Sequence, residues 1–272
     1  MKDSEKIIDI EKVIHEKNPK LLRMLPRFVL NYLKRILHED DVNAFIFKHK
    51  NDNPLEFSQA VMKKFNIQLE HEGLENIPAD GGAIIAMNHP WGGMDAMALI
   101  AVAYDKRPDL KFIVNDILMH LENLNSIFVG VNKFSKNGKN SLQSVEQTFA
   151  GDDLLCIFPA GLVSRKVKGE VVDLTWKKTF VTRSIKYDKI IIPTYIDGRL
   201  SNFFYRLSNI RKKLGIKVNI EMLFLVNELY KQHNKKITIK FGRPIQASTL
   251  DNSKSHAKWA EVIKDRVYQL KD

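Results

Sequence analysis

One stretch of the chain reads Ala83-Ile84-Ile85-Ala86-Met87-Asn88-His89-Pro90-Trp91-Gly92-Gly93-Met94-Asp95. Its opening apolar run predicts a buried strand that ends abruptly at Asn-His-Pro, and the apolar residues after Asp95 predict a helix over 96–104. A His at a strand end and an Asp at a helix start can pair across a turn. The carboxylate then holds one ring nitrogen, and the other nitrogen is free to act as a base.

The spacing between His89 and Asp95 requires a turn. On one continuous helix, residues this far apart point to nearly opposite faces, at about 100° per residue. Pro90 disfavours helix at His89, and Gly92 and Gly93 can adopt positive φ. We therefore expect a loop that brings Asp95 back to His89. The alternative is a structural His at a strand end, with Asp95 as a helix cap.

Composition restricts the class of protein. The chain has 272 residues, 44% of them hydrophobic, which suffices for one large domain or for a domain with a helical extension. A formal charge of +11 indicates anionic partners. We find no nucleic-acid-binding motif and therefore expect no nucleic acid but an anionic membrane surface. The charged N-terminus and the lack of an apolar run near 20 residues predict a cytoplasmic protein without a spanning helix.

The single cysteine, Cys156, excludes an intramolecular disulfide and a zinc site that needs several thiolates. It lies in an apolar run, which predicts a buried, inert thiol. No other ligand cluster has the spacing of a metal site, so we expect no metal.

Residues 1–65 are predicted to form an N-terminal helical extension that associates with membranes. We expect a helix over 19–38, kinked or split at Pro26, and further helices over 41–50 and 55–65. Apolar residues at near-helical spacing alternate with Lys20, Arg23, Arg27, Lys34 and Arg35. This pattern is typical of a helix that lies in a membrane interface. The alternative is a helix that packs on the domain with its charges in solvent.

Residues 66–272 are predicted to form an α/β domain, with one mostly parallel or mixed sheet flanked by helices. The expected strands are 67–72, 83–87, 111–114, 127–131, 154–158, 190–195 and 237–241. The expected helices are 96–104, 141–150, 175–187 and 221–231. Active sites in such sheets lie at the carboxyl ends of strands, where His89 stands.

A second motif follows the strand that contains Cys156. It reads Phe158-Pro159-Ala160-Gly161-Leu162-Val163-Ser164-Arg165-Lys166. Backbone N–H groups in the turn, together with Arg165, suit an anion, and Ser164 could donate a hydrogen bond. Two such turns on neighbouring strands would frame one cleft. The alternative is an ordinary strand-to-loop turn with solvated charges.

Together the two motifs resemble the glycerolipid (lysophospholipid) acyltransferase family. That family has a His and an Asp separated by four residues, followed by Phe-Pro-Glu-Gly. Here five residues separate His89 from Asp95, and Ala160 replaces the Glu. In both departures the chain resembles one bacterial branch of the family. That branch includes hemolysin-like proteins and the O-acyltransferases that make ornithine and glycine lipids. Further matches to this branch are Trp176, Phe180, Pro193, Asp197, Gly198, 201–205 and 241–245.

The resemblance implies an O-acyltransferase that moves an acyl chain from acyl carrier protein or coenzyme A to the hydroxyl of a lyso-lipid. It implies no acyl-enzyme and no cofactor beyond the thioester co-substrate. His89 would be the general base and Asp95 its partner, with oxyanion donors near Gly161 and Leu162. The missing Glu favours an acceptor other than lysophosphatidic acid. The implied location is peripheral, on the inner face of the cytoplasmic membrane. The residues implied in substrate binding are Asn88, Trp91, Gly92, Gly93, Phe158, Pro159, Ala160, Gly161, Leu162, Ser164 and Arg165.

Three other functions compete with this interpretation. A lipid or thioester hydrolase could use the same base with water as acceptor, although the chain has no Gly-x-Ser-x-Gly elbow. A non-enzymatic, membrane-binding lytic protein would use only the basic amphipathic N-terminal region. A nucleotide-binding loop at 137–141 is disfavoured, because Lys133 stands where such a loop needs Gly.

Overall fold

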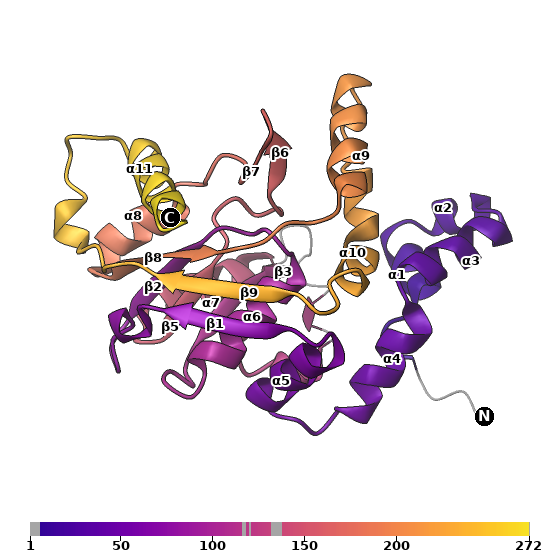
Figure 1. Ribbon diagram of the computed structural model, residues 1–272, viewed down its shortest axis with the longest axis horizontal. Helices are drawn as coiled ribbons and strands as arrows, with labels where there is room; N and C mark the ends of the chain where they lie inside the picture. The colour runs from indigo at the N-terminus through magenta and orange to yellow at the C-terminus, as the bar shows by residue number, and fades with distance from the viewer. Residues whose placement is uncertain (1–5, 116–117, 120, 132–137, 272) are drawn as a thin grey trace.

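A seven-stranded sheet forms the centre of the described part of the chain (Figure 1). The computed structural model describes residues 6–115, 118–119, 121–131 and 138–271. Lys133 and Asn137, in the segment compared above with a nucleotide-binding loop, lie outside these residues. The strand order is β1-β9-β8-β2-β5-β3-β4. The strands are β1 (Gln68–Glu72), β2 (Ala83–Met87), β3 (Lys111–Asn115), β4 (Phe128–Val131), β5 (Leu154–Ile157), β8 (Ile190–Ile196) and β9 (Lys236–Phe241).

The sheet is mixed, as predicted. β2 pairs in parallel with both β5 and β8, whereas β9 is antiparallel to β8 and parallel to β1. In Figure 1 the arrow of β9 points to the left, so the carboxyl ends of β2, β5 and β8 lie toward the right. The two turns singled out in the sequence follow the adjacent strands β2 and β5, which confirms that they share one edge of the sheet.

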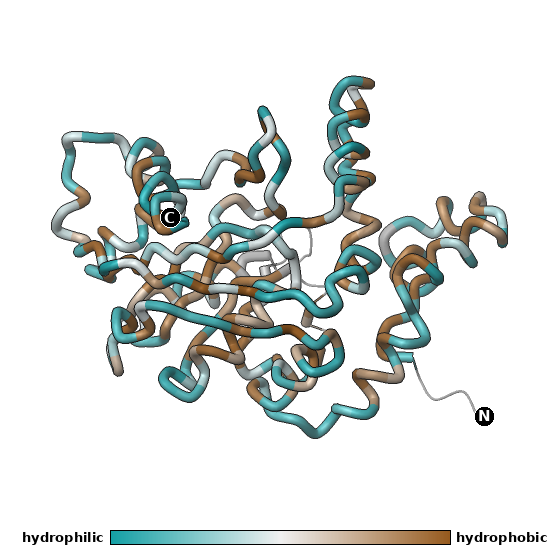
Figure 2. The backbone as a smooth tube through the Cα atoms, viewed as in Figure 1, coloured by the Kyte–Doolittle hydropathy of each residue, from teal (hydrophilic) through white to brown (hydrophobic). Residues whose placement is uncertain are grey.

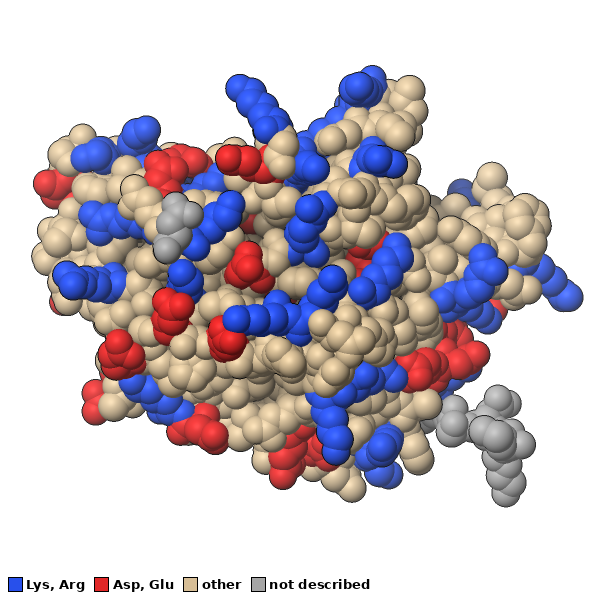
Figure 3. Space-filling model, viewed as in Figure 1, with Lys and Arg blue, Asp and Glu red and all other residues tan. Residues whose placement is uncertain are grey.

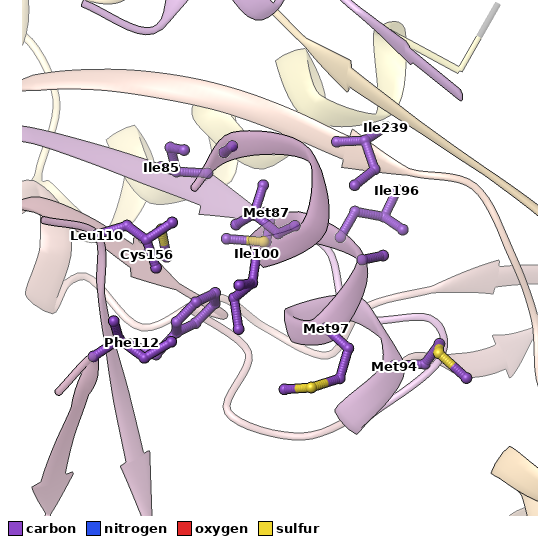
Figure 4. Packing of buried hydrophobic residues seen from close by; sticks show 14 of the residues in the cluster. Ile85, Met87, Met94, Met97, Ile100, Leu110, Phe112, Cys156, Ile196 and Ile239 are labelled. Carbon is purple, nitrogen blue, oxygen red and sulfur yellow. The ribbon is translucent and has the colours of Figure 1, made fainter. Parts of the chain in front are cut away.

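Two apolar cores cover the two faces of the sheet. The first contains α5 (Pro54–Lys64) and α6 (Gly93–Ala103), and the second contains α7 (Gly138–Ala150), α8 (Thr179–Tyr187) and α11 (His256–Gln269). β2 is buried on both faces, because Ile85 points into the first core and Ile84 into the second. Figure 4 shows Met97 and Ile100 of α6 among the strand residues Phe112, Cys156 and Ile196. This burial explains the uninterrupted apolar run of β2.

Helices before residue 50 lie at one end of the molecule, and the last of them joins the first core through Ile46. They are α1 (Ile10–Lys17), α2 (Pro19–Met24), α3 (Arg27–Ile36) and α4 (Glu39–Lys48). The predicted helix over 19–38 is split at Pro26, whose ring and missing N–H prevent a continuous helix. α5 belongs to the first core through Phe57, Val61 and Met62. None of the helices in the described residues is long and apolar enough to cross a bilayer.

Several elements differ from the sequence prediction. The hairpin of β6 (Arg165–Val167) and β7 (Glu170–Val172), α9 (Asn202–Lys213) and α11 were not predicted, and α1 lies in the predicted helical extension, for which no bounds were predicted before residue 19. The predicted helix over 221–231 is a 3₁₀ turn, η4 (Ile220–Phe224), followed by α10 (Leu225–Tyr230). The predicted helix over 175–187 begins only at Thr179, and that over 96–104 begins at Gly93. The apolar pattern of α9 does not mark its buried side, because that side includes Ser208 and Arg211, whereas Phe203 and Ile210 are exposed.

Candidate active site

The turn between β2 and α6 brings His89 and Asp95 together. Gly92 has φ of 73°, in the left-handed region that the sequence predicted for a glycine here, whereas Gly93 begins α6. The His89 Nδ1 lies 2.8 Å from the Asp95 Oδ2. The same carboxylate oxygen accepts a hydrogen bond from the Trp91 backbone N–H at 3.0 Å. The predicted pairing is therefore present, and Asp95 is not merely a cap of the helix.

The Asp95 carboxyl group is fully buried. Burial raises its pKa from 3.8 to about 6, although the hydrogen bond from His89 and the Trp91 N–H partly oppose that rise. Its place in the first turn of α6 also favours the charged form. The other carboxylate oxygen, Oδ1, has no hydrogen-bond partner among the described residues. Both hydrogen bonds to the carboxylate, from the imidazole and from the Trp91 N–H, are therefore made by Oδ2.

The His89 residue is held from several sides. Its ring stacks on Phe158 of the second motif, with centroids 3.9 Å apart and planes 26° apart. Its backbone carbonyl accepts from the Ser164 N–H at 2.8 Å, and its own N–H donates to Asp173 at 3.2 Å. The side chain is 17% exposed. Because Asp95 occupies Nδ1, Nε2 is the ring nitrogen that remains for chemistry.

Asp173 organises the region behind His89, and the sequence analysis missed it. Its Oδ1 accepts from the His89 N–H and from the Ser164 hydroxyl, and its Oδ2 accepts from the Trp176 indole N–H. The backbone N–H of Asp173 donates to the Tyr268 hydroxyl of α11. The only sequence signal was its place three positions before Trp176, a residue already matched to the family branch. Asp173 fixes the main chain at the base and does not touch its ring.

Two residues expected to bind substrate have structural partners instead. The Asn88 side-chain amide makes two hydrogen bonds to the backbone of Ile196. Its Oδ1 accepts from the Ile196 N–H at 2.7 Å, and its Nδ2 donates to the Ile196 carbonyl at 2.8 Å. It therefore joins the end of β2 to β8. The buried Ser164 hydroxyl donates to Asp173 at 2.6 Å. Both roles follow from burial, because buried polar groups are nearly always hydrogen-bonded inside the protein.

Arg165 also differs from its expected role as an anion ligand. Its guanidinium is buried and pairs with Glu221 at 2.9 Å, and Arg211 of α9 pairs with the same carboxylate at 2.9 Å. Phe204 lies under the guanidinium. Burial lowers the pKa of Arg165, and Glu221 opposes that shift. Arg165 therefore links the β6–β7 hairpin to α9 and is not available to a ligand.

The second motif forms a tight turn beside the His89 ring. The Gly161 N–H donates to the Phe158 carbonyl at 2.9 Å, and Gly161 has φ of 69°. The Gly161 N–H is thus occupied, contrary to the expectation that it is free for an oxyanion. The N–H of Leu162 has no hydrogen-bond partner among the residues that the structure describes. Pro159 and Ala160 complete the turn, in which the Pro159 carbonyl accepts from Lys177.

A cationic cavity of about 660 Å³ borders the turn at Trp91. The Trp91 indole N–H donates to the Asp197 carbonyl at 2.6 Å, which places the ring against the end of β8. Figure 3 shows Lys and Arg side chains gathered around α9 and the right-hand end of the sheet. The basic residues that line the cavity are Arg199, Lys231, Lys235, Lys236 and Lys271.

Comparison with known proteins identifies the family. A family described as "Acyltransferase" matches residues 12–272. The chain belongs to this acyltransferase family. It is 42% identical to the lyso-glycine lipid O-acyltransferase of Bacteroides thetaiotaomicron, over 98% of this chain and 99% of that protein. It is also 42% identical to the lyso-glycine lipid O-acyltransferase of Phocaeicola vulgatus, over 98% of this chain and 96% of that protein.

The acyltransferase shares its fold with a solved structure. It resembles the 1-acyl-sn-glycerophosphate (LPA) acyltransferase PlsC from Thermotoga maritima, with a TM-score of 0.53 and 19% identity. The match covers 96% of this chain and 91% of that one. The family resemblance drawn from the two motifs, and the expectation of an enzyme, are confirmed.

Replacing Gly198 of the acyltransferase with Ala should displace Trp91. Gly198 has φ of 153°, and a Cβ there would lie 1.6 Å from the Trp91 indole nitrogen. The ring must move, which disturbs the turn that holds Asp95. We expect a loss of about 2 kcal/mol of stability, typical of overpacking, and a large loss of activity. Denaturant unfolding and turnover measure both effects. Gly169→Ala, where a Cβ meets nothing within 4 Å although φ is also positive, controls for backbone strain alone.

Proposed function

We propose that this acyltransferase transfers a fatty acyl chain from an acyl thioester, on acyl carrier protein or coenzyme A, to the hydroxyl of a lyso-lipid. One observation carries the proposal. A partly exposed imidazole lies 2.8 Å from a fully buried carboxylate at the carboxyl edge of the sheet. Such a pair is suited to removing a proton from an alcohol.

The proposed reaction proceeds in two proton transfers. His89 Nε2 takes the proton of the acceptor hydroxyl while that oxygen attacks the thioester carbonyl. The tetrahedral intermediate expels the thiolate, which regains the proton from the imidazolium. The products are an ester and a free thiol, and Asp95 stabilises the charged ring between the two steps. The Leu162 N–H is our candidate donor to the thioester oxyanion.

The acceptor that we propose is a lyso-glycine lipid. The support is the activity named for both relatives at 42% identity over almost their whole length. The Ala160 in place of the family Glu is compatible with an acceptor other than lysophosphatidic acid. A glycine headgroup linked through its nitrogen presents a carboxylate, and Arg199, Lys235 and Lys271 would attract it into the cavity beside Trp91.

We further propose that the enzyme works on the inner face of the cytoplasmic membrane as a peripheral protein. The support is the surface of α2 and α3, where Leu21, Met24, Phe28 and Tyr32 are exposed among basic residues. Such a surface suits the headgroup region of an anionic leaflet.

The test is acceptor-dependent thiol release by the purified protein. Acyl-CoA and acyl-ACP are offered separately, each with lyso-glycine lipid, with lysophosphatidic acid or with no acceptor. We expect release with lyso-glycine lipid and a product heavier by one acyl group in mass spectrometry. Release at the same rate without any acceptor would indicate a hydrolase. Lysis of vesicles without thiol release would indicate a lytic protein, and either result would contradict the proposal.

A further inference from the structure

The far end of α9 exposes aliphatic side chains that nothing in the described structure covers. Leu214 is 68% exposed and Val218 is 71% exposed, and Ile210 and Ile216 are also exposed. The opposite side of α9 is anchored by Phe204, Tyr205 and Arg211, which are buried. In Figure 1 this end of α9 rises above the rest of the chain, and Figure 2 shows hydrophobic segments there. We call residues 210–218 the α9 tip.

The exposed charged side chains of the α9 tip are all lysines. Lys212, Lys213 and Lys217 are exposed there. The sequence has no Asp or Glu between Gly198 and Ile220. Exposed aliphatic residues next to lysines, with no acidic residue, complement an apolar layer beneath anionic headgroups.

The α9 tip stands on the same side of the sheet as the active site and the N-terminal helices. The carboxyl ends of β2 and β8 point to the side where α9 stands (Figure 1). Tyr32 of α3 and Phe203 of α9 line one cavity of about 410 Å³. The N-terminal helices therefore lie beside the start of α9, and the α9 tip is at the other end of that helix.

We infer that the α9 tip is a second membrane-contact element, which inserts its aliphatic residues into an anionic lipid surface. This inference rests on the proposed function in one respect, since it assumes that the enzyme meets its acceptor at a membrane. A second copy of the chain is a poorer occupant. A symmetric contact through the tip would bring its lysines together with no carboxylate between them.

Insertion can be read with a fluorophore at the α9 tip. The chain has one cysteine, Cys156, which is buried, so a new surface cysteine can be labelled selectively. We would attach an environment-sensitive dye to Leu214→Cys and, as a control, to Leu142→Cys on α7, where the native side chain is 59% exposed. With phosphatidylglycerol vesicles we expect a blue shift and increased emission at position 214 and none at 142. Unchanged emission at 214 in vesicle-bound protein would overturn the inference. So would a shift that follows protein concentration without vesicles, because it would indicate self-association.

The charge at the tip gives an independent measurement. Lys212→Gln/Lys213→Gln should lower the vesicle partition coefficient by about fivefold per lysine on phosphatidylglycerol-containing vesicles and leave it unchanged on pure phosphatidylcholine. The control Lys254→Gln/Lys258→Gln changes the same charge near α11, away from the tip. Equal partition of the two double variants onto phosphatidylglycerol-containing vesicles would overturn the inference. Turnover on detergent-dispersed acceptor should be normal in all variants. If the unaltered enzyme showed no such turnover, the proposed function would be contradicted instead.

Discussion

Replacing His89 with Asn should lower kcat by about 10³-fold and leave KM nearly unchanged. General-base catalysis contributes about 10²–10⁴-fold, and Asn has no nitrogen that can accept a proton at neutral pH. The Asn amide can still donate to Asp95 in place of Nδ1, so the buried carboxylate does not lose its partner. Acceptor-dependent thiol release measures the change, and circular dichroism checks the fold.

The chain offers a matched control for this substitution. His49 forms a second His–Asp pair, with Nδ1 2.7 Å from the Asp52 Oδ2. It lies at the end of α4, away from the β2–α6 turn. His49→Asn should leave turnover unchanged. If His89→Asn were as active as His49→Asn, His89 would not be the base and the proposed mechanism would be wrong.

Asp95→Asn should reduce kcat by roughly 10²-fold or more and remove part of the pH dependence. In the unaltered enzyme only the ionised carboxylate stabilises the imidazolium. Burial places the pKa of Asp95 at about 6, so activity should fall as the pH drops through about 6. The midpoint belongs to the coupled pair rather than to one residue. A pH profile of kcat/KM for both proteins measures the effect.

Stability should respond to the same carboxyl in the opposite direction. The folded-state pKa of about 6 lies above the ordinary 3.8, so the folded protein binds this proton more tightly than the unfolded chain. This stabilising contribution is full below 3.8 and is lost as pH rises through about 6. The Asp95→Asn side chain carries no ionisable carboxyl, so its stability does not fall as the pH rises through about 6. This variant should unfold no more easily than the unaltered enzyme at neutral pH. Asp52→Asn is the matched control, and an Asp95→Asn enzyme with unaltered rate and pH profile would contradict the assignment.

The sequence was most informative where local rules decide structure. The apolar run Ala83–Met87 had to be a strand buried on both faces, and Pro90 with Gly92 had to turn the chain, because φ limits and burial act on neighbouring residues. The split at Pro26 follows from the same kind of rule. The sequence analysis did not find α9, because polar Ser208 and Arg211 lie on its buried side while Phe203 and Ile210 are exposed.

The roles of the residues around His89 depended on contacts far along the chain. The sequence alone determined the turn that allows His89 and Asp95 to meet at a strand end, because that turn is local, and the structure then showed the contact between the two side chains. Only the tertiary structure decided which partners the polar residues have. Asn88 hydrogen-bonds to the Ile196 backbone, Ser164 hydrogen-bonds to Asp173, and Arg165 pairs with Glu221. It also placed Asp173 behind the base. A polar side chain can bind a ligand only through donors or acceptors that folding leaves without a partner. Whether it is paired depends on which distant partner the packing brings within hydrogen-bond distance.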